Sequence, residues 1–325
     1  MAEILKVENL HVHFETAAGQ VKALNGVSFV QEEEQVFCLV GESGAGKSTL
    51  ALAIMGLLPQ NATVPAGRVL FDGVDLLSAG TGHLRRIRGK EISLVFQDAQ
   101  SALNPVQTVG YQLQEVILAH QDIPTKAATT MCLEILRELG LPEPQRIMNE
   151  YPFNLSGGMC QRIMLAIALV LKPRLLIADE ATSGLDVTLQ AEILERLRSL
   201  CKDLHSAILL ITHDMGIVAH MADEVGVLYA GTLAESAEVI PLFKEPRHPY
   251  TWALLQALPR LDDVDKKLAP LPGVPPDMIN LPEQCPFLPR CQKATAKCRL
   301  ERRPLLEDIG SGHRVACYNP VLTLD

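Results

Sequence analysis

Short apolar runs alternate with longer amphipathic segments along the first 240 residues of the chain. The runs Gln35–Val40, Leu175–Ala178 and Ala207–Ile211 have the length of strands and consist almost entirely of apolar residues. We expect all three to be buried strands. Because they alternate with helical patterns, the sequence predicts an α/β domain built on a mostly parallel sheet.

The helical segments carry apolar residues at i, i+3 and i+4. This spacing runs through Thr188–Leu204, and a second stripe, Thr130–Leu139, ends at Gly140. Each stripe is predicted to pack into the core. Two further helices, Leu50–Leu58 and Met159–Leu171, are predicted directly after glycine-rich segments.

The composition changes in the C-terminal part of the chain. Of the 21 prolines, 11 fall between Pro241 and Pro289, where they repeatedly interrupt regular helix or sheet. We therefore divide the chain into a main domain, residues 1–240, and a Pro- and Cys-rich extension, residues 241–325. No internal repeat is found, so the main domain is predicted to occur once.

The charge balance limits the partners. With 38 acidic and 29 basic residues the net charge is −9, so we expect no general basic surface and no nucleic-acid partner. The start MAEILKVENL has no signal-peptide pattern, and the longest apolar run, Ile163–Leu171, is too short to span a bilayer. The sequence predicts a cytosolic type of protein.

A glycine-rich motif follows the strand QVFCLV. The segment GESGAGKST matches G-x-x-x-x-G-K-[ST] between a predicted strand and a predicted helix, which is the context that this phosphate-binding loop requires. Its backbone N–H groups are expected to surround phosphates, Lys47 to supply a positive charge, and Ser48 to ligate Mg²⁺. The predicted nucleotide-binding residues here are Gly41, Glu42, Ser43, Gly44, Ala45, Gly46, Lys47, Ser48 and Thr49.

Polar residues at the ends of other strands complete the predicted site. In LLIADE, Asp179 is predicted to hold Mg²⁺ through water and Glu180 to polarise the attacking water, although the pair also suits an ordinary strand end. His213 in LLITHD is expected at the γ-phosphate, and Gln97 in LVFQD at Mg²⁺ and the water. Phe14 is a candidate for stacking on a purine, with a core strand residue as the alternative.

Six motifs occur in the order typical of ATP-binding-cassette (ABC) ATPases: GESGAGKST, the Gln97 loop, LSGGMCQR, LLIADE, SGLD and ITHD. Over about residues 3–240 the chain therefore resembles that family, and FKEPRHPYTWALLQALP, LPGVPP and the cysteine tail resemble the ATPase subunits of oligopeptide and dipeptide permeases. The resemblance implies a RecA-like parallel-sheet core, an N-terminal antiparallel β subdomain and a helical signature subdomain. Ala181, Cys160 and Phe14 depart from the usual motif residues without removing a group that hydrolysis needs.

The same resemblance implies a function. It is Mg²⁺-dependent ATP hydrolysis that drives uptake of dipeptides or oligopeptides by a bacterial importer, with nickel or metal chelates as the alternative solute. It further implies a second ATPase chain, identical or different, two transmembrane permease subunits, an extracytoplasmic binding protein and a peripheral place on the cytoplasmic face of the inner membrane. A soluble ABC ATPase acting on DNA or ribosomes is a remote alternative, because the sequence has no coiled-coil insertion and no second cassette.

Residues Ser156, Gly157 and Gly158 open a predicted helix. In isolation they suit a helix N-cap, in which Ser156 satisfies a backbone amide of its own helix. In the ATPases that the chain resembles, two cassettes pack head to tail and each LSGG closes over the ATP of the other. The resemblance also implies that Asp186 of SGLD belongs to the D-loop, and that residues 98–105 contact the membrane subunit.

Eight cysteines fall into two sets. Cys38, Cys132, Cys160 and Cys201 lie singly in apolar or helical stretches and are predicted to be reduced thiols. The other set has the spacing C-x5-C-x6-C-x18-C and predicts a metal site, because a cytosolic disulfide would be reduced: Cys285, Cys291, Cys298 and Cys317. The resemblance implies a [4Fe-4S] cluster; a structural zinc ion or unliganded thiols remain as alternatives.

Overall fold

Most of the chain is described by the structure, a computed structural model. The described residues are 2–96, 98–182, 185–258, 271 and 273–322. They form two compact units, each assembled from segments that are distant in sequence. The first unit comprises residues 1–4, 31–35 and 78–210, and the second comprises residues 5–30, 36–77 and 211–325.

The first unit contains a short parallel sheet. Its strand order is β9-β8-β7, with β7 (Ile92–Val95) pairing in parallel with β8 (Leu175–Asp179). The strand β9 (Ala207–Thr212) is buried along its whole length, although its last two residues belong to the second unit. The predicted strands at 175–178 and 207–211 are thus confirmed, and each is one residue longer than predicted.

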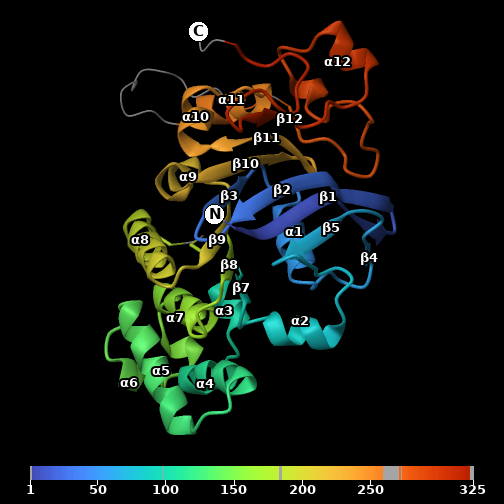
Figure 1. Cartoon of the computed structure of the whole chain (residues 1–325). Helices are drawn as coiled ribbons and strands as arrows, with labels where there is room; N and C mark the ends of the chain where they lie inside the picture. The colour runs from blue at the N-terminus through green and yellow to red at the C-terminus, as the bar shows by residue number, and fades with distance from the viewer. Residues whose placement is uncertain (1, 97, 183–184, 259–270, 272, 323–325) are drawn as a thin grey trace. The chain divides into compact units, whose positions relative to one another are not determined.

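Helices make up the rest of the first unit, and Figure 1 shows α4 to α7 gathered in one green group. The amphipathic helices α4, α5 and α7 pack against one another. Predicted helices at 188–204 and 130–139 are confirmed as α8 and α5, but α5 begins earlier, directly after Pro124. The helices are α2 (Thr81–Ile87), α3 (Ala99–Ala102), α4 (Val109–His120), α5 (Thr125–Glu138), α6 (Pro144–Ile147), α7 (Gly157–Leu169) and α8 (Val187–Asp203), with the 3-10 turn η1 (Pro152–Asn154).

The second unit contains an antiparallel sheet near the N-terminus. Its strand order is β2-β1-β5-β6, and β4 pairs with β1 beside this path. Leu5 and Val7 are buried, as are Leu10 and Val12, so residues alternate within each half of β1, as expected for a sheet with one face on the core. The alternation shifts by one position around Asn9, whose φ is 44°. The strands are β1 (Glu3–Thr16), β2 (Gly19–Glu32), β4 (Ala62–Thr63), β5 (Arg68–Phe71) and β6 (Val74–Asp75).

The second unit also carries the strand before the glycine-rich loop. The buried strand β3 (Val36–Val40) confirms the prediction at 35–40 and pairs in parallel with β10 (Glu224–Tyr229). Antiparallel neighbours follow, β11 (Thr232–Glu238), then β13 (Arg314–Val315) and β12 (Glu307–Asp308), so the C-terminal extension adds two short strands to this sheet. The helices are α1 (Lys47–Ile54), α9 (Met215–Met221), α10 (Val239–Lys244), α11 (Pro249–Gln256) and α12 (Ala296–Leu300), with the 3-10 turn η2 (Leu288–Arg290).

The proline-rich segment is more regular than its composition suggests. Pro249 stands at the first position of α11 with His248 as its N-cap, so this proline starts a helix instead of interrupting one. Pro241 lies inside the short helix α10. The expectation of repeatedly broken structure is therefore wrong for residues 241–244 and 249–256, which are helical.

The isolated cysteines agree with the sequence-based expectation of reduced thiols. All four single cysteines are buried and unpaired, and burial raises the pKa of Cys132 to about 11 and that of Cys201 to about 12. The thiols are therefore neutral near pH 7. In the described part of the chain, no helix has the length and hydrophobicity needed to cross a bilayer.

Candidate nucleotide-binding site and cysteine segment

Residues 41–49 connect β3 to α1. Gly46 is the N-cap of α1 and has φ 105°, a left-handed conformation that glycine adopts readily, and a Cβ there would overlap the carbonyl oxygen of Ala23. A glycine also has no side chain to cap the first amides of the helix. These amides and the positive end of the helix dipole are therefore suited to bind an anion.

Lys47 crosses the inside of this loop. Its side-chain amine donates hydrogen bonds to the carbonyl oxygens of Gly41 at 2.8 Å and Glu42 at 3.1 Å, and the residue is only 6% exposed. Ser48, one position further, is exposed. The loop thus places a buried ammonium group and an accessible hydroxyl in the first turn of one helix.

The two predicted carboxylates lie at the end of β8 in the first unit. Asp179 is its last residue, and Glu180 follows with φ 48°, in the left-handed region. A residue with a side chain pays roughly 1–2 kcal/mol for that conformation, and such strain collects at functional positions. The glycine-rich loop and His213 belong to the second unit.

Three other predicted residues are less informative. Phe14 lies on β1 opposite Ala62 and is only partly buried, so it is a strand residue but not one of the fully buried core residues. His213 is exposed and directly follows β9. Gln97, like Ser183 of SGLD, lies outside the described residues.

The LSGG segment begins α7. Ser156 is the N-cap of that helix, and its hydroxyl accepts a hydrogen bond from the backbone N–H of Met159 at 3.3 Å, which confirms the capping interpretation. A Cβ at Gly158 would lie 2.5 Å from the Leu189 Cδ2 atom. Gly158 therefore has a packing role within this chain, whereas Gly157 is exposed.

Asp186 has a comparable capping role. Its carboxylate accepts a hydrogen bond from the backbone N–H of Leu189 at 3.0 Å and so caps α8. Asp186 and Ser156 thus hold the beginnings of two neighbouring elements of the same unit. These capping hydrogen bonds are not evidence that either residue contacts a nucleotide.

The four cysteines of the extension surround one small cavity. The cavity measures about 20 Å³, and all four line it together with residues such as His248 and Tyr318. None of the four is in a disulfide. Among the described residues, however, no three His, Cys, Asp or Glu side chains are grouped as a metal ion requires. The predicted iron–sulfur cluster is therefore not supported by this geometry.

The surroundings of these thiols act in two directions. Burial raises the pKa of Cys285 to about 11 and that of Cys317 to about 12. Backbone N–H groups oppose this effect, since those of Phe287 and Leu288 face the Cys285 sulfur and that of Asn319 donates to the Cys317 sulfur at 3.4 Å. Without a metal the Cys285 and Cys317 thiols are neutral near pH 7, although the amides around them would stabilise thiolates.

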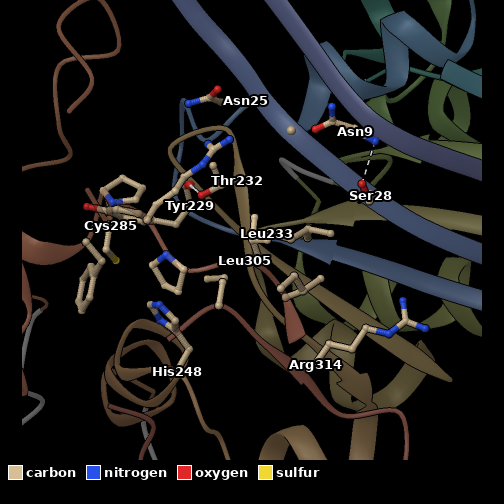
Figure 2. A pocket seen from close by; sticks show the side chains of 18 of the residues that line it. Asn9, Asn25, Ser28, Tyr229, Thr232, Leu233, His248, Cys285, Leu305 and Arg314 are labelled. Carbon is tan, nitrogen blue, oxygen red and sulfur yellow. Dashed lines mark hydrogen bonds between the residues drawn. The ribbon is translucent and has the colours of Figure 1, made fainter. Parts of the chain in front are cut away.

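A larger cavity lies in the second unit between β1, β2, β11 and the extension. It measures about 520 Å³, and Figure 2 shows side chains such as Tyr229, His248, Cys285 and Arg314 along its walls. None of residues 41–49 lines it. The cavity is therefore separate from the candidate nucleotide loop.

Comparison with known proteins identifies the family. The family model described as ABC transporter matches residues 24–183, and the model described as oligopeptide/dipeptide transporter, C-terminal region, matches residues 234–298. The dipeptide transport ATP-binding protein DppD of Bacillus subtilis is 46% identical over 299 residues, which are 92% of this chain and 89% of the relative. The chain belongs to the oligopeptide/dipeptide group of ABC transporter ATP-binding proteins.

Further matches agree with this assignment of the ABC ATPase. The oligopeptide transport ATP-binding protein OppD of Haemophilus influenzae is 42% identical over 318 residues, which are 98% of each chain. Among solved structures, a dimeric ATP-binding cassette in a post-hydrolysis state, bound to ADP and Pi, matches with a TM-score of 0.66 and 25% identity, covering 73% of this chain and 99% of that chain. The predicted α/β cassette fold and the ATPase activity are confirmed, and ATP with Mg²⁺ is the family's substrate. The iron–sulfur cluster has no support from these matches.

One residue outside the nucleotide motifs, Arg290, also contacts the nucleotide loop. Glu42 was predicted as a nucleotide-binding residue of the loop, and its carboxylate pairs with Arg290 of the extension, which was not predicted. Arg290 stands in LPRC, outside every nucleotide motif. No periodicity or spacing signals a contact between residues 248 positions apart.

Proposed function

We propose that this ABC ATPase is the ATP-hydrolysing subunit of a bacterial importer of dipeptides or oligopeptides. The match of residues 234–298 to the C-terminal region of oligopeptide/dipeptide transporters carries the proposal. The relatives described above are named for dipeptide and oligopeptide transport, which favours peptides over nickel or metal chelates. Their names also favour a transporter over a soluble ATPase that acts on DNA or ribosomes.

The proposal includes partners and a location. We expect two transmembrane permease subunits, a second ATPase chain and an extracytoplasmic binding protein, with this chain held peripherally at the cytoplasmic face of the inner membrane. Residues 98–105 are the expected contact with the permease. Affinity purification from solubilised membranes should recover permease subunits, and vesicles containing the complex should take up a labelled dipeptide when ATP is supplied. Uptake of nickel without uptake of peptide would contradict the proposed substrate.

We propose that the predicted site residues act on one triphosphate. Lys47 and the first amides of α1 bind the phosphates, Phe14 stacks on the base, and His213 contacts the γ-phosphate. The Glu180 carboxylate accepts a hydrogen bond from the attacking water and polarises it. The left-handed backbone at Glu180 supports a functional role for this residue, because strain of this kind persists where the surrounding structure maintains it.

The residues proposed for Mg²⁺ suit its chemistry. Ser48, Asp179 and Gln97 supply oxygen atoms, which are the ligands that Mg²⁺ prefers. The exposed Ser48 hydroxyl and the carboxylate at the end of β8 fit this role. When bound there, Mg²⁺ would neutralise part of the phosphate charge.

The hydrolytic role is tested with Glu180→Gln. A positioned general base typically contributes about 10²- to 10⁴-fold to a rate, so ATP hydrolysis in the complete transporter should fall by that range while ATP binding is retained. The matched control is Glu192→Gln, which changes an exposed glutamate on α8 and should leave hydrolysis unchanged. A normal rate for Glu180→Gln would remove Glu180 from the proposed role.

We further propose that the LSGG segment acts on the ATP of a second cassette. The dimeric state of a structurally similar cassette supports this arrangement, as do the exposed positions of Ser156 and Gly157 at the beginning of α7. Gly157→Asp is a sharper test than Gly158→Asp, because a side chain at Gly158 meets Leu189 of its own chain. Gly157→Asp should leave ATP affinity of the isolated subunit unchanged and abolish ATPase activity of the complex. Equal losses in both assays would instead assign LSGG to its own nucleotide.

We also propose a metal at Cys285, Cys291, Cys298 and Cys317, with a [4Fe-4S] cluster ahead of zinc. The observation in favour is that all four cysteines line one cavity and that backbone N–H groups face the sulfur atoms of Cys285, Cys291 and Cys317. Protein purified without oxygen should contain iron and sulfide in about equal amounts if the site holds a cluster. One zinc ion per chain would show that the site holds zinc and not a cluster. Protein that contains neither metal would contradict the proposed metal site.

A further inference from the structure

A side chain of the cysteine segment, residues 285–317, reaches the nucleotide loop. Arg290 ends η2 between Cys285 and Cys291, and its side chain is only 5% exposed. Its Nη1 atom donates to Glu42 Oε2 at 2.8 Å and its Nη2 atom donates to Glu42 Oε1 at 3.0 Å. Two parallel bonds of this kind fix the carboxylate in orientation as well as in position.

Glu42 is the second residue of the loop, and three contacts hold it besides the hydrogen bond that its carbonyl oxygen accepts from the Ala45 backbone N–H at 3.2 Å. Arg290 binds its carboxylate, its backbone N–H donates to the Tyr250 hydroxyl at 3.0 Å, and its carbonyl oxygen accepts from Lys47 at 3.1 Å. Two of these contacts come from the C-terminal extension. The third comes from the lysine that is expected to bind phosphate.

Aromatic rings enclose this contact. Arg290 also donates to the Tyr229 hydroxyl at 3.1 Å, and the ring centroids of Tyr229, Tyr250 and Phe287 lie 4.5 to 5.4 Å apart. Figure 2 shows Tyr229 and Cys285 on the same side of the neighbouring cavity. Apolar surroundings strengthen an ion pair whose hydrogen bonds are complete.

The charge of Glu42 explains why this contact matters for ATP. An unpaired carboxylate in a phosphate-binding loop would repel a triphosphate, and it would also compete for Lys47. Paired with Arg290, the carboxylate charge is neutralised, and the carbonyls of Gly41 and Glu42 stay bound to Lys47. We propose that Arg290 is a positioning residue for ATP binding, through which the cysteine segment keeps the Glu42 carboxylate from repelling the triphosphate and from competing for Lys47.

This inference rests on the proposed role of residues 41–49, which is tested separately by Lys47→Ala. The main experiment measures ATP affinity of the full chain by calorimetry for the wild type, Arg290→Met, Glu42→Gln and the double variant. Arg290→Met removes the charge and should weaken ATP binding about 10-fold, the size typical of one charge-assisted contact. The double variant should recover most of the affinity, because no unpaired carboxylate remains.

Recovery in the double variant separates positioning from general damage to the fold. If Arg290→Met binds ATP like the wild type, or if the double variant binds as weakly as Arg290→Met, the inference is wrong. Arg290→Lys keeps the positive charge but cannot form two parallel hydrogen bonds with the carboxylate, so its ATP affinity should be intermediate. If Lys47→Ala also binds ATP normally, the proposed nucleotide loop fails, which is a different result from failure at Arg290.

A matched control and a second arm complete the test. Arg302→Met removes another arginine of the segment, one whose pair with Glu283 is exposed, and should leave ATP affinity unchanged. Cys291→Ser disturbs the residue next to Arg290 and should weaken ATP binding in the wild-type background. The same substitution should have little effect in the Glu42→Gln/Arg290→Met background. Equal losses in both backgrounds would show that the cysteine segment does not act through Arg290.

Discussion

The nucleotide loop, residues 41–49, and the cysteine segment, residues 285–317, belong to the same unit but are held in different ways. The loop takes much of its shape from its near neighbours in sequence, a strand before it, a helix after it, and Lys47 bonded to carbonyls five and six residues away. Distant residues also bind it, as Arg290 and Tyr250 do at Glu42. The cysteine segment has only η2, the short helix α12 and two two-residue strands. Its position depends on contacts with residues far away in the sequence.

Buried polar groups provide those contacts. Glu235 on β11 is fully buried and accepts hydrogen bonds from the His313 ring at 2.6 Å and from the backbone N–H groups of Arg247 and His248. Arg290 on Glu42 is the second such anchor. The difference teaches that a short motif can be locally encoded, whereas a segment with little regular structure needs partners from elsewhere in the fold.

The largest effect is expected at Glu235. Glu235→Ala leaves the buried amide of His248, the partly buried amide of Arg247 and the buried His313 ring without their acceptor, so unfolding free energy should fall by about 3–5 kcal/mol. Urea unfolding measures the loss, and limited proteolysis should cut the cysteine segment earlier than in the wild type. Glu235→Gln keeps an acceptor and should lose less. Unchanged unfolding and proteolysis in Glu235→Ala would contradict the comparison, because contacts other than those of Glu235 would then hold the cysteine segment in place.

Lys47→Ala should produce the complementary result. Loss of the ammonium group should weaken ATP binding by about 10- to 100-fold, corresponding to a hydrogen bond to a charged group, because the charge contacts the phosphates. Unfolding free energy should change less than in Glu235→Ala. Calorimetric titration with ATP and urea unfolding of the same sample provide both values. If Lys47→Ala lost much stability but bound ATP normally, Lys47 would have a structural role and not a role in ATP binding.

Acid should lower the free energy of unfolding through the protonation of His248. Burial lowers the pKa of His248 from its usual 6.5 to about 4, while Glu235 acts in the opposite direction. Between these two values the unfolded chain binds more protons than the folded chain, so stability falls as pH drops through 6.5 and the loss is complete near pH 4. The shift corresponds to a loss of about 2 kcal/mol between pH 7.5 and pH 5.

Urea unfolding at both pH values, on the wild type and on His248→Asn, measures this contribution. Asparagine can still cap α11 but does not titrate, so the variant should lose less stability on acidification. An equal acid effect in both proteins would show that His248 is not its source.

The smallest effect on the free energy of unfolding is expected at an exposed ion pair that joins Arg302 of the cysteine segment to Glu283. Arg302 and Glu283 lie 3.2 Å apart with side chains 85% and 75% exposed. Arg302→Gln should change the unfolding free energy by at most about 0.5 kcal/mol, because exposed ion pairs contribute little. Thermal or urea unfolding checks this value. A loss as large as that of Glu235→Ala would mean that surface charge, not burial, holds the segment.

Local patterns in the sequence determined the elements around the nucleotide loop. Continuous apolar runs marked β3, β8 and β9, since a buried strand has no polar face, and helical spacing marked α5 and α8. Glycines at the loop marked a backbone that a side chain would obstruct, as the contact at Gly46 shows. Family membership also followed from the order of short motifs. These features depend on residues within a few positions of one another, so a linear sequence displays them.

Only the tertiary structure decided which distant residues hold the functional segments. Arg290 and Glu42 are 248 positions apart, and His313 and Glu235 are 78 positions apart. Gly158 packs against Leu189 of another helix, a contact that neither the N-cap interpretation nor the family resemblance predicted. Prolines of the extension start or join helices where composition suggested interruption. The physical reason is the same in each case: burial, charge pairing and close packing depend on which chain segments meet in space, and no local period records that meeting.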